Sequence, residues 1–280
     1  MPDLLEPLSY GFVQRALLGA TLVAIACASV GVFVVLRGLA FLGDAVAHIA
    51  FPGVVIAFML KTDLVIGGSI AAIGGALAIG LVGRRSGLRE DTIIGIVFSG
   101  MFALGIVLFS TIRAYTGDLL GALLGDVLGI SAGQLWLAAL TALFVVVVLW
   151  LVWKEIVFVS FDPTGAAAAG LPVARYDALL LVLVGLAIAI SIQIVGVVLV
   201  VALLVTPAAT ARLIARKLQH MLFYALLFAG ISALAGIYAS YYLNTASGGT
   251  IVLVATALFV VVWVMQALGA RTRDLTAVRG

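Results

Sequence analysis

The sequence predicts an all-α, polytopic helical membrane protein, and three observations carry that prediction. Hydrophobic residues make up 65% of the 280 residues, and the mean hydropathy is +1.34. Charged residues make up only 10%, whereas soluble domains carry about a quarter. The apolar residues fall in runs of about 20, the length that an α-helix needs to cross a bilayer.

Nine apolar segments are expected to be membrane-spanning helices of one transmembrane domain, residues 1–280. The first follows Asp3 and Glu6 and lacks an A-x-A-like cleavage site, so we interpret it as a crossing rather than a signal peptide. An alternative count of eight applies if residues 178–213 form one crossing with a re-entrant piece. The nine segments are residues 12–36, 40–60, 64–83, 92–112, 133–153, 178–193, 195–213, 221–243 and 249–268.

The third segment carries a packing signal. Gly67, Ala71 and Gly75 recur there at four-residue spacing. Small residues in this pattern let two helix backbones approach closely in lipid. We interpret the pattern as a helix-packing stripe.

The basic residues predict the orientation of the chain, because Lys and Arg concentrate on the cytoplasmic side of a membrane. With residues 83–91 placed inside, all but three of the 15 basic residues fall on the cytoplasmic side. The three exceptions are Arg15, Lys61 and Arg113. The C-terminus is therefore expected in the cytoplasm. Because topology accounts for the basic charge, the net charge of +3 does not indicate a nucleic-acid partner.

The stretch 154–177 is expected to be a cytoplasmic loop that carries one short helix. An alanine run including Ala166 is bounded by Asp162-Pro163 at its start and by Gly170 at its end, and these residue types begin and end helices. A short helix between two crossings has no core of its own. We therefore expect it to dock a soluble partner.

An aspartate and a histidine interrupt the second apolar segment. Asp44 and His48 are four residues apart, which places both side chains on one helix face. Counted from Arg37 at ~1.5 Å per residue, they lie about 10 and 16 Å along the helix, inside a hydrocarbon core about 30 Å thick. An aspartate at the bilayer centre costs about 2.5–3.5 kcal/mol, so both groups are expected to face protein or water.

Three interpretations of Asp44 and His48 remain open. Pro52 has no N–H and cannot bond the carbonyl of His48, so a carboxylate, an imidazole and a carbonyl oxygen lie together. These donors suit a divalent ion such as Mn²⁺, Fe²⁺ or Zn²⁺. The alternatives are an internal hydrogen-bonded Asp–His pair that steadies the helix, and a proton relay, since histidine titrates near neutral pH. The spacing alone does not separate them.

Several enzyme motifs are missing from the sequence. There is no G-x-x-x-x-G-K-[ST] P-loop, no H-E-x-x-H and no G-x-S-x-G. The single cysteine, Cys27, excludes an internal disulfide and a cysteine-rich metal site. We therefore expect a protein that is not an enzyme and holds no cofactor.

Four stretches, in order, resemble the membrane permeases of ABC importers for manganese, zinc and iron. They are "GVFVVLRGLAFLGDAVAHIAFPGVVIAF" (31–58), "REDTIIGIVFSGMFALGIVL" (89–108), "FDPTGAAAAGLPV" (161–173) and "VGVVLVVALLVTPAATARL" (195–213). The resemblance implies a type II importer-like permease domain in the plasma or inner membrane. It implies three kinds of partner: a second permease copy in a homodimer, a dimer of a separate cytoplasmic ATPase, and an extracytoplasmic metal-binding protein.

The resemblance also implies roles for particular residues. Asp44 and His48 match the family's Asp and His on the metal's path. The helix with Asp162, Pro163, Ala166 and Gly170 matches the element that couples the permease to its ATPase. The favoured function is ATP-driven import of a divalent metal, with manganese ahead of zinc and iron because oxygen donors outnumber nitrogen donors and no thiolate is available. The alternatives are a proton-coupled secondary metal transporter and a membrane receptor or scaffold that transports nothing.

Overall fold

The computed structural model describes residues 6–112 and 127–277, with the backbone alone from residue 269. Its elements are a 3-10 turn, η1 (Glu6–Ser9), and a series of α-helices. The helices are α1 (Gly11–Leu36), α2 (Ala40–Met59), α3 (Leu64–Ser86), α4 (Glu90–Ser110), α6 (Ala132–Leu151), α7 (Trp153–Phe161), α8 (Pro163–Ala168), α9 (Val173–Val195), α10 (Val197–Ile214), α11 (Leu218–Leu243) and α12 (Ser247–Ala277).

The predicted membrane spans are confirmed within the described part of the chain. Nine of its helices are long and apolar enough to cross a bilayer, namely α1 to α4, α6 and α9 to α12. The alternative with eight crossings is not supported, because α9 and α10 are separate spans of 23 and 18 residues. The chain turns between them at Gly196, whose φ of +82° suits glycine.

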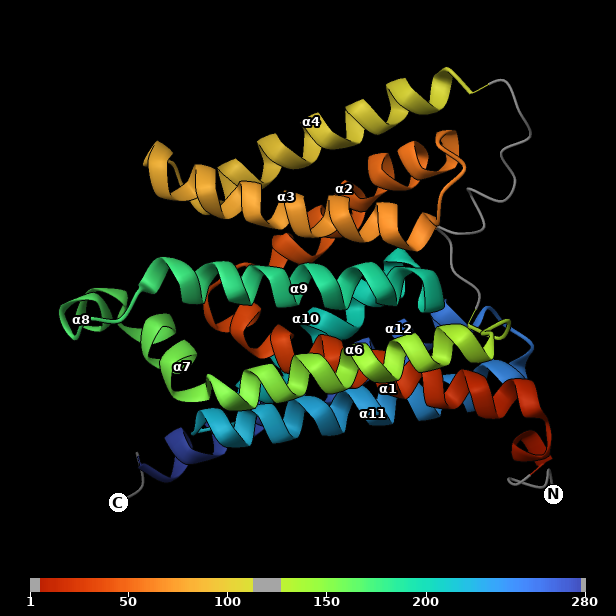
Figure 1. The fold of residues 1–280 in the computed structure, drawn as a ribbon. Helices are drawn as coiled ribbons and strands as arrows, with labels where there is room; N and C mark the ends of the chain where they lie inside the picture. The colour runs from red at the N-terminus through yellow and green to blue at the C-terminus, as the bar shows by residue number, and fades with distance from the viewer. Residues whose placement is uncertain (1–5, 113–126, 278–280) are drawn as a thin grey trace.

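The centre of the bundle is formed by α1 and α9, each with 72% of its apolar 18-residue stretch buried. Figure 1 shows α2, α3 and α4 together on one side of α9, and α1, α6 and α11 on the other. The largest buried side chains fill this centre; they include Phe33 on α1, Leu183 and Ile188 on α9, and Leu203 and Leu204 on α10. Burial of large apolar side chains in one contiguous cluster gives the helices a common core.

The close packing predicted from the small-residue stripe of α3 is present against α2. A methyl group on Gly53 of α2 would collide with the carbonyl oxygen of Gly67 on α3, and one on Gly67 would collide with that of Gly53. Gly75 leaves similar room for the side chain of Ile49. Because only glycine allows this backbone contact, α2 and α3 form one tightly packed hairpin.

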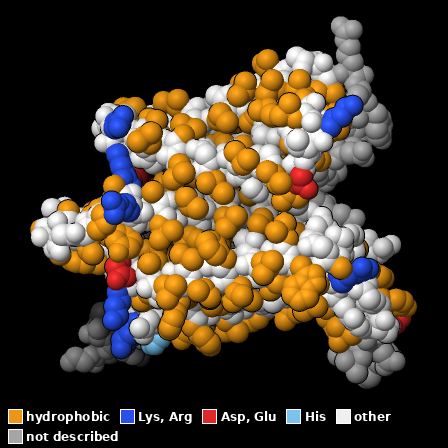
Figure 2. All heavy atoms as spheres, viewed as in Figure 1, with side chains coloured by type: hydrophobic (Ala, Val, Ile, Leu, Met, Phe, Trp, Pro, Cys, Tyr) orange, Lys and Arg blue, Asp and Glu red, His pale blue; other side chains and the backbone are white. Residues whose placement is uncertain are grey.

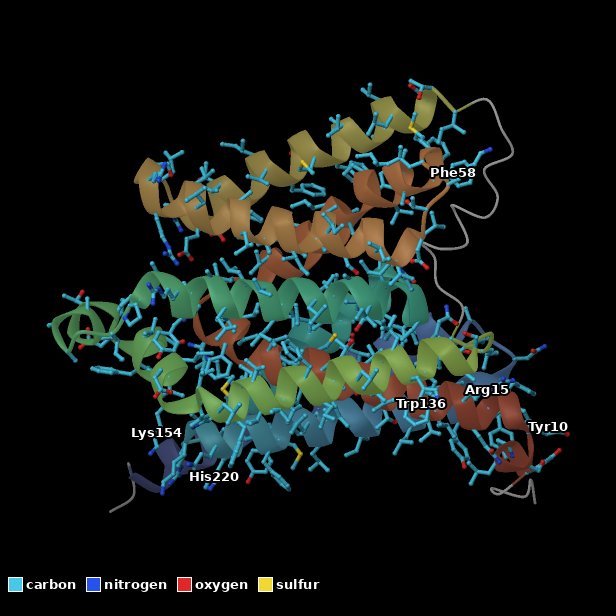
Figure 3. The ribbon with its side chains drawn as sticks, in the orientation of Figure 1. Tyr10, Arg15, Phe58, Trp136, Lys154 and His220 are labelled. Carbon is cyan, nitrogen blue, oxygen red and sulfur yellow. The ribbon has the colours of Figure 1, made fainter. Side chains whose placement is uncertain are left out.

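Charged side chains lie at the two ends of the bundle. Figure 2 shows hydrophobic side chains across the middle of the visible face and most Lys and Arg side chains at its opposite rims. Lys154 and His220 lie at the end from which α8 projects, here called the α8 end, and Tyr10 and Arg15 lie at the other end (Figure 3). Arg113, Arg279 and the side chains of Arg271 and Arg273 lie outside the described residues.

The stretch 154–177 differs from the single-helix loop that the sequence predicts. Trp153–Phe161 forms a second helix, α7, whose Ile156 and Val159 are buried, and α9 begins at Val173 rather than near residue 178. Hydropathy misplaces both boundaries for one physical reason. A helix ends where its backbone hydrogen bonds end, not where the apolar run ends. It can therefore continue through charged side chains.

Candidate metal site and coupling segment

Helix α2 carries the predicted metal ligands on the face that turns away from the core. Gly38, with a φ of +73°, lets the chain reverse direction between α1 and α2. Leu42, Val46 and Ala50 bury the inner face of α2. Asp44 and His48 lie on the opposite face, with 49% of the Asp44 side chain and 32% of the His48 side chain exposed.

The geometry of His48 leaves one ring nitrogen available. Its Nδ1 lies 2.9 Å from the backbone carbonyl oxygen of Asp44. A carbonyl can only accept a hydrogen bond, so Nδ1 carries a proton, and in the neutral imidazole Nε2 then carries the lone pair. Among the described residues Nε2 has no hydrogen-bond partner. This is the arrangement in which metal-binding histidines are usually held, with the second nitrogen donating to an oxygen.

The carboxylate of Asp44 is close to the ring without being tied to it. Its Oδ1 lies 3.5 Å from Nδ1 of His48, which is beyond the usual range for a hydrogen bond. The shorter contact of the ring is to the backbone, so the geometry disfavours the interpretation of a self-contained Asp–His pair. Among the described residues neither carboxylate oxygen of Asp44 accepts a hydrogen bond, and Oδ1 is at ion-pair distance from the ring when His48 is protonated.

Aromatic side chains from α4 flank the histidine. The ring of His48 meets Phe98 and Phe102 edge to face, with centroids 5.4 and 5.5 Å apart. Phe98 and Phe102 are four residues apart and therefore share a helix face. Sequence reasoning missed them, since their spacing was visible but nothing related that face of α4 to α2. They exclude water from one side of the ring and fix its orientation.

The carbonyl of His48 is the third candidate ligand. Pro52 lies inside α2 and is buried, and its ring Cδ would lie 3.2 Å from a Cβ on Gly105 of α4. Because Pro52 has no N–H, the helix supplies no donor to the carbonyl of His48. Helix α2 continues through Pro52 without a break, and the free carbonyl of His48 stays a prediction.

Asp44 and His48 are the two candidate metal-binding side chains that lie together in the part of the chain that the structure describes. The described residues contain no cluster of three or more His, Cys, Asp or Glu side chains. Cys27 is buried in α1, with its Sγ 3.5 Å from Ser191 Oγ. A divalent transition metal takes four to six ligands, so the side chains of Asp44 and His48 would fill only part of a coordination shell.

The short helix α8 is built as the sequence predicts. The Asp162 side chain accepts a hydrogen bond of 2.8 Å from the N–H of Gly165, which caps the first turn. Gly170 adopts a φ of +83°, and the N–H groups of Gly170 and Leu171 donate to the carbonyls of Ala167 and Ala166. This pair of bonds is a Schellman motif, which ends helices at glycine.

The four residues predicted for coupling do not share one surface. Asp162, Pro163 and Gly170 are exposed, whereas Ala166 is completely buried. A helix this short buries one stripe against its neighbours, and Ala166 lies on that stripe. The exposed residues of α8 and its C-cap have small side chains; they are Pro163, Thr164, Ala167, Ala168 and Ala169.

Comparison with known proteins assigns the chain to a family. The sequence model of the ABC 3 transport family matches residues 9–266. The chain belongs to this family. Among the relatives of this ABC 3 protein are the manganese transport system membrane protein MntC of Halalkalibacterium halodurans, 46% identical over 90% of this chain and 86% of MntC, and the chelated iron transport system membrane protein YfeD of Yersinia pestis, 40% identical over 91% of this chain and 86% of YfeD.

A solved structure supports the same assignment for the fold. PsaBC from Streptococcus pneumoniae, in complex with Fab, superposes with a TM-score of 0.82 at 34% identity and covers 93% of this chain and 94% of that one. The predicted resemblance to the ABC importer permeases is therefore confirmed. The ABC 3 protein is a multi-pass helical permease of the ABC transporter class.

Proposed function

We propose that this ABC 3 protein is the permease subunit of an ATP-driven importer of divalent transition metal ions, with manganese as its main substrate. Zinc and iron are the competing substrates. The observation that carries the proposal is the uncovered Asp44–His48 pair of α2, in which the lone pair of His48 Nε2 and both carboxylate oxygens are available. The metal is cargo, so the pair has to hold it only in passing.

The incomplete ligand set supports a homodimer. If α2 of one copy faces α2 of a second copy, two carboxylates and two imidazoles meet on the symmetry axis. Two carboxylates neutralise the charge of M²⁺, which lowers the free energy of the ion inside the hydrocarbon region. The exposed fractions of Asp44 and His48 in the single chain are consistent with a face that a second copy covers.

The donor set and the relatives both support manganese. Carboxylate and carbonyl oxygens with imidazole nitrogen are donors of hard to borderline character, and no thiolate is nearby to favour zinc or copper. MntC of Halalkalibacterium halodurans is described as a manganese transport protein, and YfeD as one for chelated iron. Selection against zinc, which binds such sites more tightly, then falls partly to the binding protein that delivers the ion.

A separate cytoplasmic ATPase dimer is proposed to drive the cycle. The chain has no P-loop of its own, and α8 presents an exposed, capped surface at the end where the basic residues gather. That end, with the C-terminus, is then cytoplasmic by the distribution of Lys and Arg. An extracytoplasmic metal-binding protein docks at the opposite end.

The transport cycle follows from these parts. The binding protein releases the ion into the path between the two copies, where Asp44 and His48 of each copy bind it. ATP binding and hydrolysis move α8, the two openings of the path alternate, and the metal leaves when the facing helices separate. The shared site of two Asp44 and two His48 side chains is complete only while the two copies of α2 are close together.

Uptake of radioactive manganese into proteoliposomes tests the proposal, with the permease, its ATPase and the binding protein reconstituted together. Asp44→Ala and His48→Ala are expected to lower ATP-driven uptake by about 10–100-fold or more, the range seen when support of a metal site is lost. Asp91→Ala and His220→Ala are matched controls, because both residues are exposed and far from the pair in sequence. Competition with Zn²⁺ and Fe²⁺ ranks the substrates.

Two results contradict the proposal. One is uptake at the wild-type rate in both Asp44→Ala and His48→Ala. The other is uptake that follows a proton gradient without ATP or any ATPase subunit, which identifies the proton-coupled transporter instead.

A further inference from the structure

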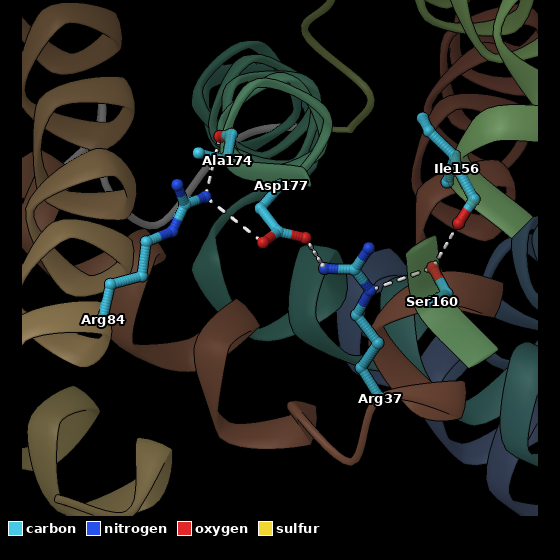
Figure 4. A network of polar contacts seen from close by, with 6 residues as sticks. All are labelled: Arg37, Arg84, Ile156, Ser160, Ala174 and Asp177. Carbon is cyan, nitrogen blue, oxygen red and sulfur yellow. Dashed lines mark hydrogen bonds and ion pairs between the residues drawn. The ribbon is translucent and has the colours of Figure 1, made fainter. Parts of the chain in front are cut away.

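One carboxylate joins three helices at the α8 end of the bundle. Asp177 lies in the first turns of α9, shortly after α8. Its Oδ1 accepts a hydrogen bond of 2.8 Å from Arg37 Nη1, and its Oδ2 accepts one of 3.2 Å from Arg84 Nη2 (Figure 4). Arg37 ends α1, and Arg84 lies in the last turn of α3. The two arginines reach Asp177 from opposite sides, and we call the three residues the Asp177 clamp.

The Arg37 arm of the Asp177 clamp also holds α7. Arg37 Nε donates to Ser160 Oγ at 3.0 Å, and Ser160 Oγ donates to the Ile156 carbonyl at 2.6 Å. Only 16% of the Arg37 side chain is exposed, and its Nη2 is buried without a hydrogen-bond partner in the described part of the chain. Within that part Asp177 is the only carboxylate at ion-pair distance from Arg37, and Glu90 lines the same cavity without pairing with it. Loss of the Asp177 carboxylate leaves an unpaired buried cation, which is strongly unfavourable.

The Arg84 arm grips the start of α9 twice. Arg84 Nη2 donates to the Ala174 carbonyl at 2.7 Å as well as to Asp177. Arg84 belongs to α3, which packs backbone against backbone with α2 at Gly53 and Gly67. A displacement of the start of α9 is therefore passed to α2 through α3.

The two arms converge on the helix that carries Asp44 and His48. Arg37 is separated from the start of α2 at Ala40 only by Gly38 and Leu39, so one arm holds the N-terminal end of α2 directly. The other arm holds α2 through the α2–α3 hairpin. On the opposite side of the Asp177 clamp, four residues separate α8 from α9, and Asp162 alone separates α8 from α7.

We propose that Asp177 is a positioning residue for transport, and that the Asp177 clamp transmits the movement of α8 to the metal-binding helix α2. This inference rests on the proposed function. On one side the clamp connects to α7, α8 and α9, and on the other side it connects to α1, α2 and α3. The coupling segment and the metal ligands therefore move as one body. Without the charge of Asp177, α8 moves and α2 does not follow.

A cavity beside the clamp gives the arginines room to move. It measures about 210 Å³ and is lined by Arg37, Arg84 and Asp177, by a second carboxylate, Glu90, and by apolar residues such as Leu42, Ile79 and Leu180.

The test compares ATP hydrolysis with manganese uptake in the reconstituted complex. Asp177→Asn keeps the shape of the side chain and removes its charge. It is expected to lower the number of ions taken up per ATP by about tenfold, in the range by which residues along a coupling path act, while ATP hydrolysis stays close to the wild-type rate. Asp177→Glu restores the charge and is expected to recover most of the coupling. Asp91→Asn and Arg85→Gln, both exposed at the same end, are the matched controls.

A second measurement reports on α2 without relying on the cargo. Phe41 on α2 is 71% exposed and the native Cys27 is buried, so a spin label on Phe41→Cys is selective. In the wild-type background the distance between the two labels of the dimer is expected to change with ATP, and with Asp177→Asn it is expected to stay constant while ATP is still hydrolysed. If Asp177→Asn does not assemble with the ATPase, Arg84→Gln, at the more exposed arm, replaces it in both measurements.

The outcomes separate this inference from the proposed function. The proposed function fails if Asp44→Ala still takes up manganese. The Asp177 clamp is overturned if Asp44→Ala behaves as expected but Asp177→Asn keeps the wild-type ratio of ions to ATP. It is also overturned if hydrolysis and uptake fall in proportion and Asp177→Glu restores neither, because that pattern indicates a role in folding alone.

Discussion

The contact between Gly53 on α2 and Gly67 on α3 sets the position of α2, the helix that carries the proposed metal ligands, and Gly53→Ala tests this contact. The new Cβ would lie against the carbonyl oxygen of Gly67, 2.9 Å from that carbonyl carbon and 2.5 Å from the Cβ of Ala71. The obstructing oxygen belongs to a helix backbone and cannot rotate away. An ordinary C···O contact is about 3.3–3.6 Å, so the two helices have to separate by about 1 Å.

The magnitude follows from this overlap. Overpacking of a close contact costs about 1–3 kcal/mol, which corresponds to about 5–150-fold in the folding equilibrium. Alanine gains about 1 kcal/mol of helix propensity over glycine, so the net loss is up to about 2 kcal/mol; because the obstructing atom is backbone oxygen, we expect a cost at the upper end of the overpacking range. We expect the midpoint of thermal unfolding to fall by on the order of 5 °C, and uptake to fall with it because His48 lies five residues from Gly53.

The matched control is Gly74→Ala on α3. Gly74 is exposed, and a Cβ there meets nothing within 4 Å. Thermal unfolding of the two variants in the same detergent, followed by tryptophan fluorescence, gives the comparison. We expect Gly74→Ala to match or exceed the wild type. Equal midpoints for Gly53→Ala and Gly74→Ala would refute the argument that the α2–α3 backbone contact fixes α2.

Two further predictions concern the coupling segment. Asp162→Ala removes the side chain that caps the Gly165 N–H, which costs about 1 kcal/mol of helix stability. We expect this variant to bind the ATPase about fivefold more weakly in a pull-down titration, whereas Asp162→Asn keeps the cap and the affinity. Equal binding by both variants and the wild type contradicts the prediction. Ser160→Ala removes the hydrogen-bond acceptor of Arg37 Nε and is expected to lower the free energy of unfolding by about 1–3 kcal/mol. The same thermal unfolding measures it, with Ser86→Ala at an exposed helix end as the control. An unchanged midpoint contradicts the idea that Arg37 holds α7 through Ser160.

Much of the fold follows from the sequence because each span is a local feature. An apolar run of about 20 residues in lipid has to satisfy its backbone hydrogen bonds internally, so the run becomes a helix. The ends of α8 were predictable because they too are local features: Asp162 and Gly170 form hydrogen bonds or turns with residues next to them in the sequence. The helix α7 was not predicted, because Lys154 and Glu155 break the hydropathy signal while leaving the backbone helical.

The candidate site was only half predictable. The four-residue spacing of Asp44 and His48 predicts a shared face, but it does not say that Nδ1 bonds the Asp44 carbonyl or that Phe98 and Phe102 flank the ring. The Asp177 clamp joins residues that are 140 and 93 positions apart in the chain. A single sequence holds no signal for such pairings, which depend on how the helices pack.

Metal binding to the permease–ATPase complex tests the central claim, a site shared by two copies of α2. Equilibrium binding of Mn²⁺ is combined with pulsed electron paramagnetic resonance, which detects a coordinating imidazole nitrogen. The account predicts one Mn²⁺ per two permease chains with a nitrogen signal that disappears in His48→Ala, and loss of binding in Asp44→Ala. One ion per chain, or binding that survives in both variants, would contradict it.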